Sequence, residues 1–245
     1  FRNEGMDRTH NPEFTMLEFY VAYKDYNWMM GFVENLFEET VKSVHGKTKI
    51  DYNGKEIDFK GPYKRIPFFE AIKGGAGDDI SKMTKEQLEK YCKSKNIEIN
   101  KSMGRGKLFD AVFAEFCEEK LIQPTYITDY PIEMSPLTKK HRSKEGLTER
   151  FELFINGKEI ANAYSEQNNP IEQRESFEEQ MKLGKRGDDE AMVIDNEFLR
   201  ALEYGMPPTS GIGIGMDRLT MLLTNKKSIQ DVLFFPQMKP EKKWK

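Results

Sequence analysis

The sequence predicts an α+β protein, in which hairpin-forming strands and amphipathic helices share one chain. Two Asn-Gly pairs, Asn53-Gly54 and Asn156-Gly157, each separate two alternating runs, which is the pattern of a tight β-hairpin. Apolar residues also recur every three or four positions, most clearly over residues 25–45, which predicts a long amphipathic helix. We therefore expect helices packed on a sheet that is built largely from hairpins.

The strand predicted after residue 13 has one polar face. Side chains alternate along a strand, and one face carries a ring, a thioether, a carboxylate and a phenol: Phe14, Met16, Glu18 and Tyr20. This face suits a small ligand better than a hydrophobic core. The opposite face, with Leu17, Phe19 and Val21, is expected to point into the core. Taken alone, the pattern favours an ordinary amphipathic hairpin with a polar outer face.

The residues before that strand are charged. Arg2 and Glu4 share a parity on a predicted incoming strand, and His10 lies in the connecting loop. An arginine in this position can bind a phosphate or a carboxylate through its planar guanidinium.

A helical module is predicted in the middle of the chain. A short helix is expected to end at residues 74–75, and residues 76–120 differ from their surroundings in lacking strand alternation. Thr84 and Gln87 form a capping-box pattern for one helix, and residues 107–121 predict another. We expect this module to be an insertion packed on the outside of the sheet.

The second hairpin is acidic. If Asn156-Gly157 is a two-residue loop, Phe154 opposes Glu159 and Glu152 opposes Ala161, so the two glutamates share a face. Two such carboxylates repel unless a cation lies between them, and Mg²⁺ accepts one or two carboxylates together with phosphate oxygens. The hairpin alone is equally compatible with a solvent-exposed edge.

A glycine-rich strand precedes the last predicted helix. Gly211, Gly213 and Gly215 alternate with isoleucines, which leaves one strand face without side chains and suggests close approach of a ligand. Arg218 follows near the start of the helix, where an anion is favoured. A tight strand–helix joint would explain the glycines but not the arginine.

Composition sets broad limits. The 245 residues include 38 basic and 41 acidic side chains with a net charge of −3, which does not indicate a dominant nucleic-acid surface. Cys92 and Cys117 lack metal-ligand spacing and are expected to be reduced. No apolar run reaches membrane length, so we expect a cytoplasmic location and no membrane partner. The chain begins at Phe1, and we expect it to be part of a longer protein.

Two runs resemble a known family. Arg-Asn-Glu at 2–4, followed by His-Asn-Pro-Glu-Phe-Thr at 10–15 and Glu-Phe-Tyr at 18–20, resembles motif 2 of class II aminoacyl-tRNA synthetases in its lysine-specific form. The Gly-Ile-Gly-Ile-Gly-Met-Asp-Arg run at 211–218 resembles motif 3. Over its whole length the chain is similar to the C-terminal part of a class II lysyl-tRNA synthetase.

The resemblance implies a fold and an activity. Residues 1–245 would form part of the α+β class II catalytic core, an antiparallel sheet flanked by helices and truncated at its N-terminal side, with a helical insertion at about 76–120. The implied reaction is ATP-dependent activation of L-lysine to lysyl-adenylate with Mg²⁺, then transfer to the 3′ end of tRNA(Lys). The full-length protein would be a homodimer, and this fragment would be weakly active or inactive alone.

The resemblance also implies roles for residues. ATP would be bound by Arg2, Glu4, His10, Asn11, Phe14, Gly215 and Arg218, with Arg2 and Arg218 as the catalytic pair. Lysine would be bound by Glu18, Tyr20, Asn162, Glu166 and Gly213, and Mg²⁺ by Glu152 and Glu159. Simple alternation from Glu159 would put Asn162 and Glu166 on the opposite face, so a bulge is expected near residues 160–163.

Alternatives have their own signals. A relative that joins lysine to a protein lacks the helical insertion, and an aspartate or asparagine enzyme would need a basic pocket in place of Glu18 and Glu166. A non-catalytic binding module related to the synthetases is a further alternative. The chain departs from the lysine pattern where Asn169 replaces an aspartate, which affects a contact behind the site.

Overall fold

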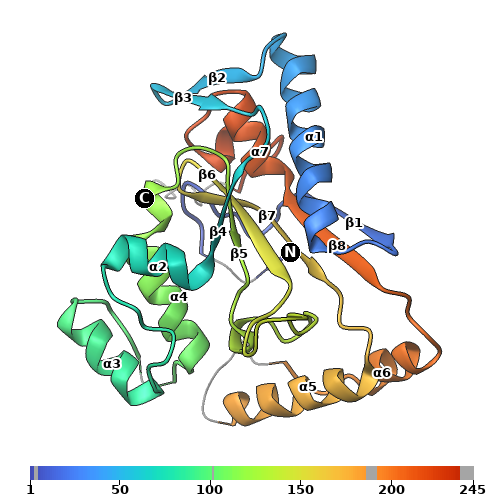
Figure 1. Ribbon diagram of the computed structural model, residues 1–245. Helices are drawn as coiled ribbons and strands as arrows, with labels where there is room; N and C mark the ends of the chain where they lie inside the picture. The colour runs from blue at the N-terminus through green and yellow to red at the C-terminus, as the bar shows by residue number, and fades with distance from the viewer. Residues whose placement is uncertain (3–4, 101, 186–191, 238–245) are drawn as a thin grey trace, which may run out of the picture.

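We describe residues 1–2, 5–100, 102–185 and 192–237 of a computed structural model of the protein (Figure 1). The strands are β1 (Met16–Ala22), β2 (Lys49–Tyr52), β3 (Lys55–Asp58), β4 (Lys64–Pro67), β5 (Thr125–Thr128), β6 (Arg150–Ile155), β7 (Lys158–Ser165) and β8 (Thr209–Gly215). The helices are α1 (Tyr26–His45), α2 (Phe68–Ala76), α3 (Lys85–Ser94), α4 (Arg105–Phe116), α5 (Pro170–Gly184), α6 (Asn196–Glu203) and α7 (Met216–Leu223). Short 3₁₀ turns occur at η1 (Glu118–Lys120), η2 (Ile132–Met134) and η3 (Ile229–Asp231).

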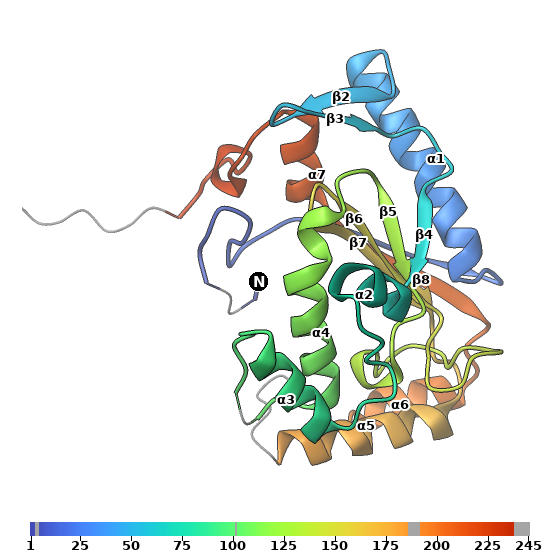
Figure 2. The same ribbon diagram turned by 60° about the vertical axis from the view of Figure 1, so that its left-hand side comes forward.

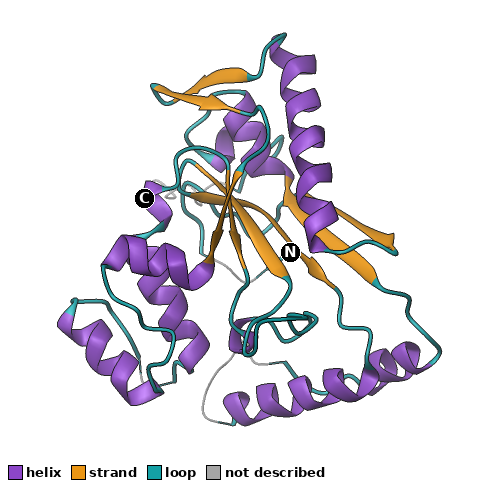
Figure 3. Cartoon of the chain, viewed as in Figure 1, coloured by secondary structure: helices purple, strands orange, loops and turns teal. Residues whose placement is uncertain are grey.

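The main sheet has the strand order β1-β8-β7-β6-β5-β4 within the described residues (Figure 3). β4 and β5 run parallel, and every other neighbouring pair is antiparallel. β2 and β3 form a separate hairpin, with Asn53 and Gly54 at positive φ as a type I′ turn requires. The predicted α+β class, with a mostly antiparallel sheet, is confirmed, whereas β4 and its parallel pairing were not predicted.

Helices cover the two faces of the sheet unequally (Figure 2). α1 and α7 pack on one face, in a core that includes Phe37 and Ile214. α2 and α4 pack on the opposite face near β5 and β6, where Phe113 and Phe154 are buried. The β1-β8-β7 end of this second face carries the cleft described below. Within the described residues, every helix is too short or too polar to span a membrane.

α1 begins and ends where the sequence supplies caps. The Asp25 side chain accepts hydrogen bonds from the N–H groups of Asn27 and Trp28, and Gly46 ends the helix at φ 71°. The helix predicted over residues 25–45 is therefore confirmed. Because α1 lies against the sheet, Phe19 and Val21 of β1 pack on the core as expected.

The helical module has the predicted elements with shifted ends. The capping box of Thr84 and Gln87 is present at α3. α2 continues one residue past the predicted end at 74–75, to Ala76, because Gly77 supplies the left-handed cap at φ 85°. The helix predicted over 107–121 begins at residue 105 and ends at residue 116, and η1 follows it. The apolar side of α4 packs on the sheet. That the helical module is an insertion stays a prediction.

Two predictions for the N-terminal region are wrong. Phe1 and Arg2 are not in a strand, and the Arg2 N–H instead donates to the carbonyl of Pro12 at 3.0 Å, which closes a loop. Leu17 is 41% exposed because β1 is the edge strand of the sheet and Leu17 lies outside its buried cores. Glu4, predicted to contact ATP, lies outside the described residues.

Candidate active site

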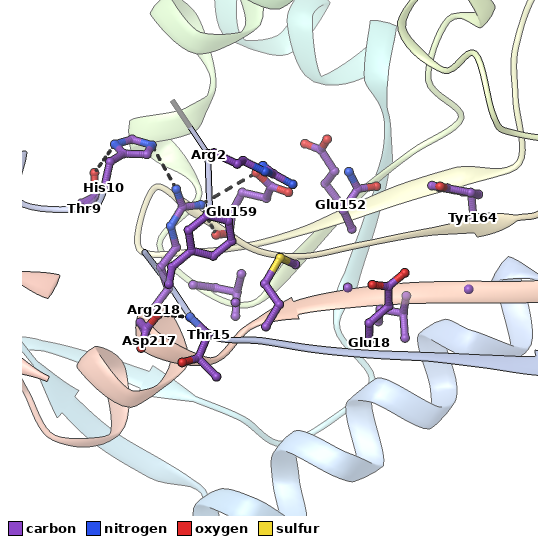
Figure 4. A pocket seen from close by; sticks show the side chains of 18 of the residues that line it. Arg2, Thr9, His10, Thr15, Glu18, Glu152, Glu159, Tyr164, Asp217 and Arg218 are labelled. Carbon is purple, nitrogen blue, oxygen red and sulfur yellow. Dashed lines mark hydrogen bonds and ion pairs between the residues drawn. The ribbon is translucent and has the colours of Figure 1, made fainter. Parts of the chain in front are cut away.

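A cleft of about 430 Å³ opens over β1, β8 and β7. It is lined by all of the described residues to which the resemblance gives a role: Arg2, His10, Asn11, Phe14, Glu18, Tyr20, Glu152, Glu159, Asn162, Glu166, Gly213, Gly215 and Arg218. Figure 4 shows two ends, with Arg2, His10 and Arg218 near Glu159 at one end and Glu18 and Tyr164 at the other. The cleft therefore has a largely cationic end and an acidic end.

A one-residue bulge makes this arrangement possible. Phe154 of β6 pairs with Glu159 of β7, but the next residue, Leu153, pairs with Ala161, so Ile160 is the extra residue. The insertion reverses the alternation, and the side chains before and after it turn to the same face. The predicted bulge near residues 160–163 is confirmed.

The bulge also corrects one predicted pairing. Glu152 lies opposite Asn162 rather than Ala161, because the extra residue shifts the register by one. After the bulge, regular alternation carries Asn162 and Tyr164 along the cleft, and Glu166 follows at the end of β7.

Glycines of β8 form the floor between β1 and β7. Gly213 pairs with Glu18 on one side and Asn162 on the other. A Cβ at Gly211 would lie 2.2 Å from Glu166 Oε1, and one at Gly213 would lie 2.8 Å from the terminal carbon of Met16. Side chains from the neighbouring strands thus use the space that these glycines leave.

The acidic end contains two carboxylates and a phenol. The Tyr20 hydroxyl donates a hydrogen bond to Glu18. Burial and the negative charge of Glu18 raise the pKa of Glu166 to about 8, although a hydrogen bond from the Gly211 N–H opposes the shift. A cation bound beside these carboxylates would favour their ionised forms.

Arg218 organises the cationic end. Its Nη1 donates to the Glu159 carbonyl at 2.8 Å, and its Nη2 lies 3.1 Å from His10 Nε2. A guanidinium only donates, so His10 Nε2 accepts and its ring proton lies on Nδ1, 2.9 Å from Asp7 Oδ2. Burial would raise the pKa of Asp7, but hydrogen bonds from Thr9 and His10 hold it well below its usual range.

Phe14 and Asn11 lie beside this end. The guanidinium carbon of Arg2 is 5.4 Å from the centroid of the Phe14 ring, in a cation–π contact. Asn11 is 4% exposed, and its Nδ2 donates to the Glu13 carbonyl at 2.5 Å. Its Oδ1 is a buried acceptor with no hydrogen-bond partner among the described residues. Such an atom is costly to bury unless water or a ligand satisfies it.

The two hairpin glutamates differ in their surroundings. Glu152 accepts hydrogen bonds from Arg150 Nη2 at 2.5 Å and from the Tyr130 hydroxyl at 2.8 Å. The Glu159 side chain is 41% exposed, and desolvation followed by the charge of Glu152 raises its pKa. No group of three or more His, Cys, Asp or Glu in the described ranges is placed to hold a metal. The glutamates thus form a pair.

Comparison with known proteins assigns the family. A family model for class II tRNA synthetases (D, K and N) matches residues 1–239. The chain belongs to this synthetase family.

Three curated relatives of this class II synthetase chain are each named lysine–tRNA ligase. The protein from Porphyromonas gingivalis is 65% identical over 242 residues, which cover 99% of this chain and 42% of the relative. The protein from Christiangramia forsetii is 64% identical over 243 residues, 99% of this chain and 43% of the relative. The protein from Azobacteroides pseudotrichonymphae is 57% identical over 242 residues, which cover 99% of this chain and 48% of the relative. The chain spans less than half the length of these relatives.

Some residues of the synthetase cleft were not predicted. Arg150 and Tyr164 line it, and Tyr130 and Asp7 hold side chains that do. Arg150 had a signal, because it lies two positions before Glu152 on the same strand and therefore faces the same side. No sequence signal indicated Tyr130, because its hydrogen bond to Glu152 joins residues 22 positions apart.

Proposed function

We propose that the full-length protein activates L-lysine with ATP and transfers it to tRNA(Lys). The observation that carries the choice of amino acid is the pair of carboxylates, Glu18 and Glu166, at one end of the cleft. The family model covers enzymes for D, K and N, and only lysine offers a cationic side chain to two carboxylates. The names of the relatives agree with this choice.

The first step joins the lysine carboxylate to the α-phosphorus of ATP. The new bond runs from a carboxylate oxygen to that phosphorus, and the bond to pyrophosphate breaks. The substrate carboxylate is already a nucleophile, so no protein base is required, and catalysis rests on positioning and charge. Arg2 would bind the α-phosphate, and His10 and Arg218 the outer phosphates.

The rest of the nucleotide and the amino acid would occupy the remaining cleft. Phe14 would stack on adenine, and Asn11 carries the buried acceptor that an amine donor could satisfy. Glu18, Tyr20 and Glu166 would bind the ε-ammonium. A site built to pair a buried cation strongly rejects analogues that lack it, because its own charges would then be left unpaired.

Glu152 and Glu159 fit a magnesium ion. Desolvation, and then the charge of Glu152, raises the pKa of Glu159, and such a pair of carboxylates suits a hard cation that takes its other ligands from phosphate and water. When bound, Mg²⁺ would supply charge neutralisation at the phosphates. Arg150 and Tyr130 would keep the Glu152 carboxylate oriented towards it.

The second step would transfer the lysyl group from AMP to the 3′-terminal ribose hydroxyl of tRNA(Lys). The partners of the full-length protein would then be lysine, ATP and the tRNA acceptor end, and we propose that it is a cytoplasmic homodimer.

Amino-acid-dependent ATP–pyrophosphate exchange tests the proposal in the full-length protein. We expect exchange with lysine and none with aspartate or asparagine. Radiolabelled lysine should then appear on tRNA(Lys). Exchange driven by aspartate or asparagine would refute the lysine assignment, and label on a protein acceptor would favour the alternative transfer.

A further inference from the structure

Arg150 lines the cleft from the start of β6, where it pairs with Tyr164 of β7. Its side chain is 13% exposed and donates in four directions. Nε donates to Asn162 Oδ1 at 3.1 Å, and Nη2 donates to Glu152 Oε1 at 2.5 Å. Nη1 donates to the Met134 carbonyl at 2.6 Å and to Ser135 Oγ at 3.0 Å. One guanidinium therefore contacts both a proposed lysine-pocket residue and a proposed magnesium ligand.

The guanidinium is held in its plane as well as at its edges. Its central carbon lies 4.6 Å from the centroid of the Tyr130 ring. The Tyr130 hydroxyl also donates to the second oxygen of Glu152, at 2.8 Å. Arg150 and Tyr130 together hold both oxygens of Glu152, so the carboxylate has little freedom to rotate.

The same contact determines which way the Asn162 amide points. Arginine has only donors, so the amide atom facing it must be the oxygen. The Asn162 nitrogen therefore points away from Arg150, and Asn162 sits opposite Gly213 on the cleft floor. In this orientation the side chain offers a donor rather than an acceptor to a ligand.

We propose that Arg150 is a positioning residue that couples the amino-acid subsite to the phosphate and metal subsite. This role rests on the proposed function, and it involves no contact between Arg150 and a reacting atom. By orienting Asn162 and Glu152 with one rigid group, Arg150 makes the geometry of each depend on the other. A lysine at position 150 would keep the charge but could not span both partners with fixed geometry.

Arg105 provides a matched control. It also donates to two backbone carbonyls, Met83 and Ser81, pairs with a glutamate, Glu133, and lies 4.7 Å from an aromatic ring, Phe109. It does not line the cleft over β1, β8 and β7, but it lines a neighbouring cavity together with Glu152 and Glu159, so it is a control for lysine binding and not for the Mg²⁺ constant. Arg105→Lys thus disturbs a similar network away from the lysine pocket.

The test uses the full-length protein and the variants Arg150→Lys and Arg105→Lys. We measure the lysine dissociation constant by calorimetry without ATP or Mg²⁺, and the half-saturating Mg²⁺ concentration in the exchange reaction. For Arg150→Lys we expect both constants to rise by about tenfold or more, the usual size of effect for a residue that orients a ligand-binding group. For Arg105→Lys we expect the lysine dissociation constant to change by about twofold or less, as for a site that is not coupled to the lysine pocket.

A double-variant cycle separates positioning from general loss of structure. If Arg150 acts on lysine through Asn162, Arg150→Lys should change lysine affinity by about twofold or less in an Asn162→Ala background. An undiminished effect in that background would overturn the proposal. Equal behaviour of Arg150→Lys and Arg105→Lys would overturn it too.

A milder variant covers the case in which Arg150→Lys lowers the melting temperature much more than the control does. Ser135→Ala removes one of the hydrogen bonds to the guanidinium, and we expect it to weaken lysine binding by about threefold, again only when Asn162 is present. No change in lysine affinity would refute the Arg150 role. If the unaltered protein does not bind lysine at all, the proposed function fails, and the Arg150 proposal fails with it.

Discussion

Lysine binding should release a proton from Glu166. Without a bound cation, burial and the charge of Glu18 raise the pKa of Glu166 to about 8, so this carboxyl is largely protonated at pH 7. The ε-ammonium of lysine would favour the ionised carboxylate and lower its pKa, and the proton would leave for the solvent. The phenols of Tyr20 and Tyr164 also face Glu166, but their raised pKa values keep them protonated throughout this range.

The pKa gives the size and direction of the effect. A group with a pKa of about 8 is roughly 90% protonated at pH 7 and roughly 10% at pH 9, so the release should fall from ~0.9 to ~0.1 proton per site. Because the bound state favours the ionised carboxyl, lysine affinity should rise with pH. The slope should approach ~10-fold per pH unit below pH 7 and flatten above pH 8.

Calorimetry in buffers of different ionisation enthalpy measures the released protons directly. In the full-length protein, Glu166→Gln should abolish both the release and the pH slope, and should weaken binding by ~100-fold or more, because it leaves the ammonium with one carboxylate fewer. Glu203→Gln, on the exposed surface of α6, is the matched control and should keep both.

A proton release below ~0.3 at pH 7, together with a pH-independent affinity between pH 6 and 8, would refute the reasoning. That result would mean that Glu166 is already ionised before lysine binds. The Glu166 carboxylate would then attract the lysine ammonium directly, with no proton released on binding.

Three further results are expected. Gly211→Ala should raise the KM for lysine by ~10-fold or more, because its Cβ would lie 2.2 Å from a Glu166 oxygen, whereas Gly31→Ala, with open space around it, should leave KM unchanged. Asp7→Asn should raise the KM for ATP by ~3-fold to 10-fold, because the His10 Nδ1–H loses its carboxylate partner; an unchanged KM would contradict this. The 245-residue chain alone should catalyse lysine-dependent exchange far below the rate of the full-length protein, and a comparable rate would refute this.

Local pattern was sufficient to predict most of the fold. Asn-Gly turns, the capping box at Thr84 and the 3.6-residue periodicity of α1 each involve neighbours in sequence, and the structure has all of them. The elements that were missed or shifted depend on distant contacts. β4 pairs in parallel with β5, some 60 residues away, and no local signal identifies that partner. The absence of the strand at Arg2 likewise follows from its bond to Pro12.

The site was predictable in its membership but not in its connections. Alternation indicates which side chains share a strand face. The resemblance placed Glu159, Asn162 and Glu166 in one site, although simple alternation would have put Glu159 on the opposite face from the other two. Neither could show that Arg150 contacts both Asn162 and Glu152, because the partners of a long side chain depend on the three-dimensional positions of the groups around its guanidinium. The His10–Arg218 link was missed for the same reason, since it joins residues 208 positions apart, whereas the Asp7–His10 bond beside it is local.

The bulge at Ile160 brings Glu159 and Glu166 into the same cleft. In the proposed function, β7 would place Glu159, whose pKa is raised by desolvation and by the charge of Glu152, beside the phosphates, and Glu166 beside the lysine ammonium. The positions of these glutamates differ by seven, an odd number, so a regular strand would point them to opposite faces. One extra residue, Ile160, returns the two side chains to a common face. Both ends of the cleft are therefore lined by β7 and the residue that follows it, so the proposed distance between lysine and ATP would be set by the covalent spacing along this strand rather than by a flexible loop.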